Sequence, residues 1–81
     1  MVTIEFDNNF EKQIIKIKNS SLKLKVKKQI GKIISNPEIG KPMRYARKGT
    51  REVYVPPFRL AYAFLHNENK IIFLKFYHKD Q

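Results

Sequence analysis

A single arginine, Arg59, lies near the start of the apolar stretch PPFRLAYAFL at positions 56–65, and no acidic residue occurs within six positions of it. If this stretch is a β-strand, alternate side chains share a face, and Arg59 points away from the large apolar side chains beside it. A guanidinium can hold a phosphate through two hydrogen bonds, and aromatic rings stack on bases. The pattern therefore predicts a surface that binds phosphates and bases. The same alternation brings these further residues to that face: Glu52, Tyr54, Lys75, Tyr77 and Lys79.

A second interpretation of Arg59 is structural. Glu52 lies in the preceding predicted strand, so the two side chains can pair across the sheet. Exposed ion pairs of this kind are common and contribute little to stability. The residues alone leave both interpretations open.

The charge balance is strongly basic, because 17 Lys and Arg face 7 Asp and Glu and give a net charge of +10 on 81 residues. Such a surface attracts polyanions such as RNA or an acidic protein, although lysine runs also serve as solvated faces. The absence of cysteine excludes disulfides and zinc–thiolate sites and fits a reducing cytoplasm. No apolar run approaches the roughly 20 residues that span a membrane, and no His, Asp and Glu have metal-ligand spacing. We expect a cytoplasmic protein with no membrane partner, no metal and no cofactor.

Two short helices are predicted in the first half of the chain. The segment 2–6 alternates like a strand, and Asp7 or Asn8 can cap the helix that follows it. The run Asn19-Ser20-Ser21 ends this helix and caps a second one, which stops at Asn36-Pro37. The result is a helical hairpin with an apolar inner side and a basic outer side.

The second half has the period of β-strands, with segments at 44–46, 51–55, 58–65 and 70–79. The fold class is therefore α+β in the order β-α-α-β-β-β-β, with the helical hairpin on one face of a small, mainly antiparallel sheet. We expect one domain over residues 1–81. Ala61 and Ala63 should leave a shallow floor beside the arginine, and Phe73 should share that open face. The side chains expected under the helices are Val53, Val55, Phe58, Leu60, Tyr62, Phe64, Ile72, Leu74 and Phe76.

Four segments, NPEIGKPMR, REVYV, PPFRLAY and IIFLKFYHK, follow the two helices in that order. In order and spacing they resemble the RelE/ParE toxin superfamily. The family's strand arginine corresponds to Arg59 in Phe58-Arg59-Leu60-Ala61-Tyr62, and its basic cluster at the end of the last strand corresponds to His78 and Lys79.

The resemblance implies a type II toxin that enters the ribosomal A site and cleaves mRNA as a metal-independent endoribonuclease. It also implies a RelB-like antitoxin as partner, in a hetero-oligomer, with the ribosome and mRNA as targets. Arg59, Lys79 and His78 are then the catalytic candidates, although alternation puts His78 on the opposite face from Arg59. We assign RNA binding to seven further residues: Arg44, Arg47, Lys48, Arg51, Tyr54, Lys75 and Tyr77.

Two other functions remain open. ParE-like relatives keep the fold but poison DNA gyrase and need no active site. Glu52 and Tyr54 stand where RelE has lysines, and no tyrosine follows the basic cluster. These two differences leave the ParE-like function open. The third hypothesis is a non-catalytic RNA-binding module that holds RNA on its open sheet face.

Overall fold

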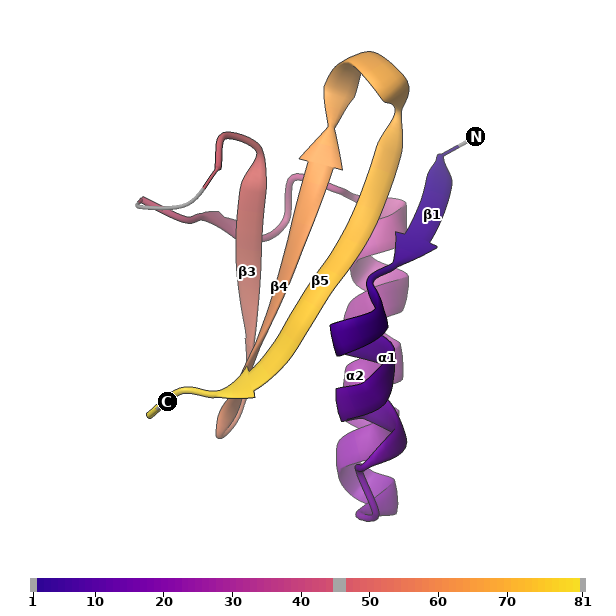
Figure 1. Cartoon of the computed structure of the whole chain (residues 1–81), viewed down its shortest axis with the longest axis vertical. Coiled ribbons are helices and arrows are strands. Elements are labelled where there is room, and N and C mark those ends of the chain that lie inside the picture. Colours follow the sequence, from indigo (N-terminus) through magenta and orange to yellow (C-terminus); the bar gives the residue numbers. More distant parts are fainter. Residues whose placement is uncertain (1, 45–46, 81) are drawn as a thin grey trace.

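The computed structural model of the chain describes residues 2–44 and 47–80. Five strands form one sheet in the order β1-β5-β4-β3-β2. The strand β1 lies at one edge of the sheet and pairs in parallel with β5 (Figure 1). All other neighbouring strands run antiparallel. The elements are β1 (Thr3–Phe6), α1 (Asn8–Ile15), α2 (Ser20–Ser35), β2 (Lys41–Pro42), β3 (Thr50–Val55), β4 (Phe58–Leu65), the 3-10 turn η1 (His66–Glu68) and β5 (Lys70–His78). The predicted α+β fold and its element order are confirmed.

Both helices begin at the caps that the sequence predicts. The Asp7 carboxylate accepts a hydrogen bond from the Asn9 N–H at 2.8 Å, and the Asn19 side chain accepts one from the Leu22 N–H at 3.1 Å. These bonds satisfy backbone donors that the first turn of a helix leaves unpaired. The helix α2 ends at Ser35, and its C-cap Asn36 stands just before Pro37. In the described residues, neither helix is long and apolar enough to cross a membrane.

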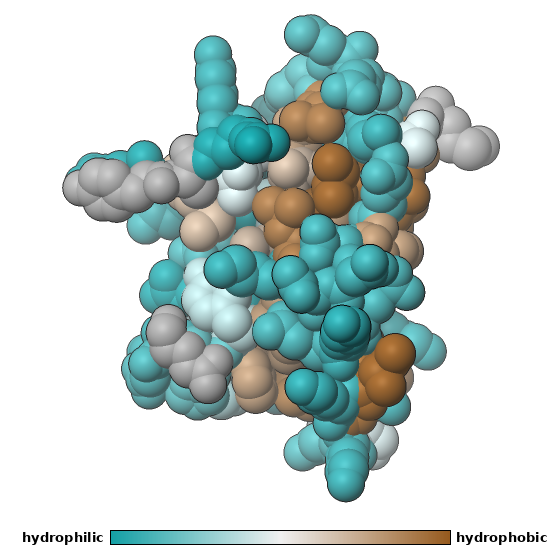
Figure 2. Space-filling model, in the orientation of Figure 1, coloured by the Kyte–Doolittle hydropathy of each residue, from teal (hydrophilic) through white to brown (hydrophobic). Residues whose placement is uncertain are grey.

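The core lies between the helical hairpin and one face of the sheet. Figure 1 shows α1 and α2 on the same side of the strands, where α1 packs against β5 and α2 against β3. Hydrophilic side chains cover much of the surface in Figure 2, with apolar groups in patches between them. The other face of β3, β4 and β5 is left open. The buried apolar residues of this core are Phe10, Ile17, Val26, Ile33, Val55, Leu60, Tyr62, Ile71, Phe73 and Phe76.

The prediction for the inner face of β5 is wrong in its first half. Ile71 and Phe73 are fully buried, whereas Ile72 and Leu74 are only partly buried. The cause is an irregularity in the pairing of β4 with β5: Ala61 pairs with Lys75, but Tyr62 pairs with Phe73, so Leu74 is an extra residue. Such a bulge shifts the alternation by one residue. Beyond it the predicted faces hold, with Phe76 in the core and Lys75 exposed.

The prediction of a strand at 44–46 is also wrong where it can be judged. Arg44 lies in a turn, and positions 45 and 46 are outside the described residues. The short strand β2 instead comprises Lys41 and Pro42, which pair with Glu52 and Arg51. A two-residue strand that contains proline has no periodicity by which a sequence could reveal it.

The hydroxyl of Tyr62 anchors the loop that leads into β2. It donates a hydrogen bond to the Pro37 carbonyl at 2.7 Å and accepts one from the Gly40 N–H at 2.8 Å, and the side chain is fully buried. A Cβ at Gly40 would lie 2.6 Å from that hydroxyl, so only glycine fits there. The loop is therefore held against the core immediately before Lys41.

We expect Tyr62→Phe to lower the free energy of unfolding by about 1–3 kcal/mol, because a buried N–H and carbonyl lose their partner. Chemical denaturation measures this loss. Tyr54→Phe is the matched control, since Tyr54 is half exposed and its hydroxyl makes no hydrogen bond within residues 2–44 and 47–80. Equal stability of the two variants would contradict the anchoring role of Tyr62.

Candidate active site on the open sheet face

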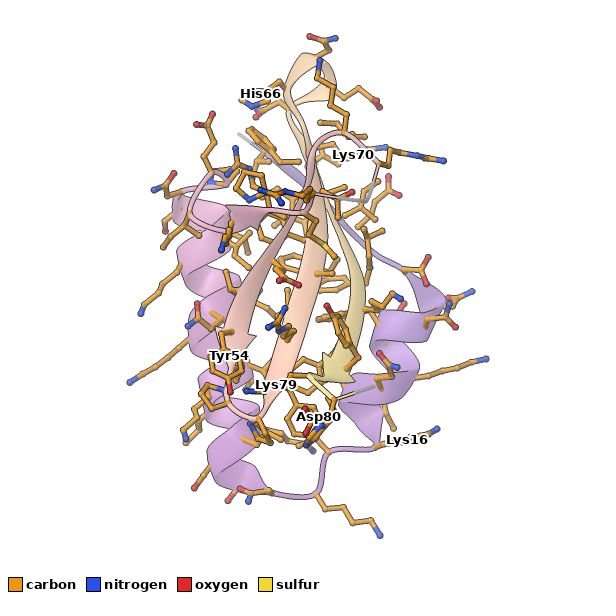
Figure 3. The ribbon with its side chains drawn as sticks, turned by 90° about the vertical axis from the view of Figure 1, so that its left-hand side faces the viewer. Lys16, Tyr54, His66, Lys70, Lys79 and Asp80 are labelled. Carbon is orange, nitrogen blue, oxygen red and sulfur yellow. The ribbon has the colours of Figure 1, made fainter. Side chains whose placement is uncertain are left out.

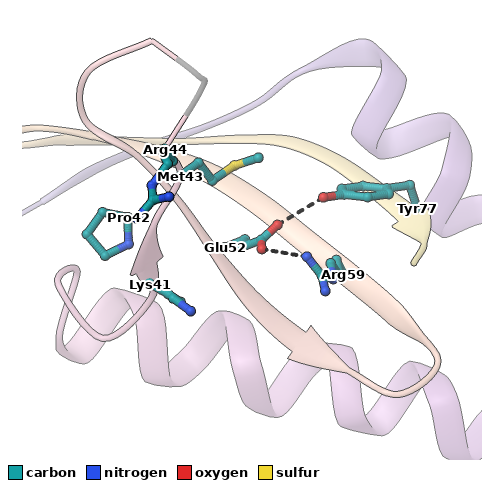
Figure 4. A pocket seen from close by; sticks show the side chains of 7 residues that line it. All are labelled: Lys41, Pro42, Met43, Arg44, Glu52, Arg59 and Tyr77. Atoms are coloured by element: carbon teal, nitrogen blue, oxygen red, sulfur yellow. Dashed lines mark hydrogen bonds and ion pairs between the residues drawn. The ribbon is translucent and has the colours of Figure 1, made fainter. Parts of the chain in front are cut away.

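The open face centres on a carboxylate held by an arginine and a tyrosine from three adjacent strands. Arg59 in β4 pairs across the sheet with Tyr54 in β3 and Tyr77 in β5. The Arg59 Nη1 lies 2.9 Å from Oε1 of Glu52, and the Tyr77 hydroxyl donates a hydrogen bond to Oε2 of Glu52 at 2.9 Å (Figure 4). Both carboxylate oxygens of Glu52 are thus oriented by neighbouring side chains.

This cluster keeps capacity for a ligand. The Arg59 side chain is 43% exposed, and it is Nη1 of its guanidinium that donates to Glu52. A guanidinium has five N–H donors, so most of them remain for a phosphate, and each carboxylate oxygen of Glu52 can accept a second hydrogen bond. Burial raises the pKa of the Tyr77 hydroxyl above its ordinary value, and the adjacent Glu52 carboxylate raises it further. Tyr77 therefore stays protonated and keeps donating at neutral pH.

Two adjoining hollows surround the cluster. The larger has a volume of about 630 Å³ and is bordered by Lys41, Arg44 and Tyr77 besides the central ion pair (Figure 4). The smaller, of about 280 Å³, adds Tyr54 and Lys79. Among the described residues, four cations thus border the two hollows against one carboxylate, which favours an anionic ligand.

The structure brings together the charged residues and the tyrosines predicted for the open face, whereas Phe73, also predicted there, lies in the core. The Lys79 ammonium lies 5.8 Å from the centre of the Tyr54 ring, and the Lys75 ammonium lies 5.5 Å from the centre of the Tyr77 ring. Figure 3 shows Tyr54 and Lys79 side by side at one end of the molecule. The alanines form no floor of the hollows, because Ala61 and Ala63 are buried and line neither of them.

Two predicted site residues lie elsewhere. His78 pairs with Phe58, on the side of the sheet opposite Arg59, and its ring packs edge-on against the Phe58 ring at 5.4 Å. Arg51 pairs with the buried Tyr62, also on the helix side, and its Nη1 donates to the carbonyls of Gly40 at 2.7 Å and Glu38 at 3.1 Å. The placement of His78 argues against a catalytic role beside Arg59, and Arg51 holds the loop before β2.

The remaining RNA-binding candidates divide between two places. Arg44 borders the larger hollow. Arg47 and Lys48 are exposed in the turn before β3, and Lys48 borders a separate hollow beside His66. Their roles remain predictions.

Sequence reasoning missed Lys41 and the hydrogen bond between Glu52 and Tyr77. Lys41 reaches the site only because β2 pairs it with Glu52, and that short strand gives no sequence signal. Glu52 was placed on the open face, but only as a structural partner of Arg59. Its isolation among cations was the signal, since among the described residues that border the two hollows it is the one carboxylate, and a carboxylate can accept a proton. No three of the metal-binding side chains His, Cys, Asp and Glu come together in the described residues.

Comparisons with known proteins place the chain in a family. The model of the ParE toxin family of type II toxin–antitoxin systems matches residues 4–81. The chain therefore belongs to this family, and the resemblance to the RelE/ParE superfamily is confirmed. No curated protein sequence matches the chain at a significant level.

Solved toxin structures share the fold. The isolated E. coli RelE toxin is 14% identical, with a TM-score of 0.83 over 100% of this chain and 87% of that one. The toxin–antitoxin complex RelBE2 from Mycobacterium tuberculosis is 23% identical, with a TM-score of 0.75 over 96% and 98%. YafQ from E. coli is 21% identical, with a TM-score of 0.74 over 99% and 96%. At these identities the likeness establishes the fold.

Proposed function

We propose that this chain is a single-domain, ribosome-dependent endoribonuclease that cleaves mRNA and thereby inhibits translation. The observation that carries the proposal is the Glu52 carboxylate, held between Arg59 and Tyr77 on an open, cationic face. A merely structural ion pair needs neither a tyrosine bonded to the second carboxylate oxygen nor additional cations around it.

The proposed reaction is attack of a ribose 2′-hydroxyl on the adjacent phosphorus. Glu52 accepts the proton of the 2′-hydroxyl, the bond from the 2′-oxygen to phosphorus forms, and the bond from phosphorus to the 5′-oxygen breaks. Arg59 stabilises the charge that develops on the phosphate, and Lys79 donates a proton to the leaving 5′-oxygen. The products are a 2′,3′-cyclic phosphate and a 5′-hydroxyl, and the chain's own side chains supply every proton transfer.

The surrounding residues position the RNA. Lys41 and Arg44 border the hollow and can bind flanking phosphates. Tyr54 offers a ring on which a base can stack once the Lys79 ammonium moves to the phosphate. Tyr77 orients the Glu52 carboxylate and, being protonated, does not compete with it as a base.

We also propose a RelB-like antitoxin as the partner in a hetero-oligomer. Two observations support this: the family is one of toxin–antitoxin systems, and three of the similar structures hold a toxin together with its antitoxin or an antitoxin peptide. The net charge of +10 favours an inhibitor with acidic segments. With the ribosome as target, the toxin acts in the cytoplasm.

The match to the ParE family model favours a second candidate function, the poisoning of DNA gyrase. This function needs no proton acceptor on the open face, so Glu52 and Arg59 would then serve only as an ion pair.

Primer extension on a reporter mRNA in a reconstituted translation reaction tests the proposed function. We expect the full chain to produce new 5′ ends within the reading frame only when ribosomes translate it. Intact mRNA together with gyrase-dependent breaks in plasmid DNA would favour the second candidate instead.

A further inference from the structure

A second cavity lies at the tip of the helical hairpin, on the side of the sheet opposite the proposed active site. Its volume is about 580 Å³, and it lies between the turn joining α1 to α2 and the adjacent ends of β4 and β5. The aromatic rings of Phe58 and Phe76, stacked at 4.8 Å, form one wall, and His78 packs against Phe58. This is the histidine that the fold separates from Arg59.

Three side chains that border this cavity, Gln13, Lys16 and Lys18, have donors without an acidic partner in the described part of the chain. Neither Lys16 nor Lys18 makes an ion pair there. Gln13 uses its Oε1 to accept the Phe76 N–H at 2.8 Å, which leaves its NH₂ group without a partner among the described residues. Within residues 2–44 and 47–80 no acid borders the cavity, and the segment between Glu11 and Glu38 contains eight lysines and no acid. A ligand that fits these lysines, the Gln13 amide and the aromatic wall has a negative charge, hydrogen-bond acceptors and a flat ring.

One acid lies close by. The Asp80 carboxylate is 3.8 Å from Nδ1 of His78, and the same nitrogen accepts a hydrogen bond from the Asp80 N–H at 3.2 Å. A phosphate is therefore favoured on the side of Lys16 and Lys18, and a base on the side of Phe58 and His78. A nucleotide has this arrangement, with a phosphate at one end and a base at the other.

The cavity and the active site share one end of the sheet. Phe58 pairs with His78, and the next pair along the strands is Arg59 with Tyr77, so the two pairs face opposite sides. Figure 3 shows Lys16 at the same end of the molecule as Lys79 and Asp80. A strand that leaves the Arg59 face can therefore pass Lys79 and continue around the edge to the cavity.

We propose that this cavity binds a nucleotide unit of the RNA strand that occupies the open face. The phosphate lies against Lys16 and Lys18, and the base packs on Phe58 and His78 with Gln13 donating to it. The proposal rests on the proposed function for the identity of the strand as RNA, and it requires no cleavage.

The two histidines make the test direct, because His66 and His78 lie at opposite ends of the hairpin formed by β4 and β5. The imidazole C–H resonances of the full chain are followed by NMR during titration with uridine 5′-monophosphate, uridine, inorganic phosphate and a short oligouridylate. We expect uridine 5′-monophosphate to shift the resonances of His78 and not those of His66. Its affinity should exceed those of uridine and of inorganic phosphate by about tenfold, the effect of one base contact or one charged contact. The oligouridylate should shift the same resonances at lower concentration.

Replacing both Lys16 and Lys18 with glutamine should weaken nucleotide binding about tenfold or more while His78 remains as the reporter. Lys12→Gln is the matched control, since Lys12 is exposed on α1 and does not border the cavity. The proposal is overturned if His78 does not respond, if inorganic phosphate binds as well as the nucleotide, or if the oligouridylate leaves His78 unshifted. Loss of mRNA cleavage with an intact His78 response would overturn the proposed function alone.

Discussion

Replacing Arg59 with alanine is expected to slow mRNA cleavage on translating ribosomes about 100- to 1,000-fold, the usual effect of removing one preorganised donor to a developing charge. The guanidinium keeps unused donors beside Glu52 at the centre of the cationic hollow, so its loss removes the group that meets the scissile phosphate. Arg59→Lys should restore only part of the rate, because an ammonium cannot form the paired hydrogen bonds of a guanidinium.

The fold should survive this change. The Arg59 side chain is 43% exposed and lies outside the core, so a thermal melt should differ little from that of the parent chain. Lys32→Ala on the outer side of α2 is the control for the simple loss of one positive charge. A folded Arg59→Ala chain that cleaves at the parent rate would refute the role given to this arginine.

Replacing Glu52 with glutamine should lower the cleavage rate about 100- to 10,000-fold, the range expected when a general base is lost. The amide has nearly the size of the carboxylate, and its oxygen can still accept the hydrogen bond from Tyr77. RNA binding should not weaken, because the change removes a negative charge from the border of the two cationic hollows. The predicted result is therefore a loss of turnover with unchanged or tighter binding to ribosomes.

Glu38→Gln is the matched control for Glu52→Gln. Glu38 pairs with His66 at 3.3 Å and borders neither hollow of the active site, so its neutralisation should leave the rate unchanged. If Glu52 is only the partner of an ion pair, Glu52→Gln will alter stability by a small amount and leave cleavage intact. That outcome would favour the gyrase-directed function of ParE toxins.

Much of the fold could be predicted because local signals agree with the final packing. Asp7 and Asn19 are short polar side chains directly before helical periodicity, and both act as caps. The alternation of β4 correctly separates Arg59 from Leu60 because no irregularity interrupts that strand before Ala61. One extra residue near Leu74 then displaces the pattern of β5, and a bulge depends on pairing with another strand, which no local pattern records.

The sequence predicts which side chains share the open face of the sheet but not the contacts that they make with one another. Alternation placed Glu52, Arg59 and Tyr77 together, but the hydrogen bond that joins Tyr77 to Glu52 depends on how side chains turn above the sheet. Lys41 joins them through a strand too short to predict. Arg51 shows the converse case. Its charge indicated RNA binding, whereas in the structure it lies beside Tyr62 and donates to backbone carbonyls of the chain itself.

The most direct test of the proposed reaction is cleavage of a ribosome-bound mRNA that carries a 2′-deoxynucleotide immediately before the mapped cut. Attack by the 2′-hydroxyl under the control of Glu52 and Arg59 predicts that this mRNA stays intact, while the matched all-ribose mRNA yields a 2′,3′-cyclic phosphate and a 5′-hydroxyl. Equal cleavage of the two mRNAs, or no cleavage of either by the folded chain, would contradict the assignment of this face as a ribonuclease site.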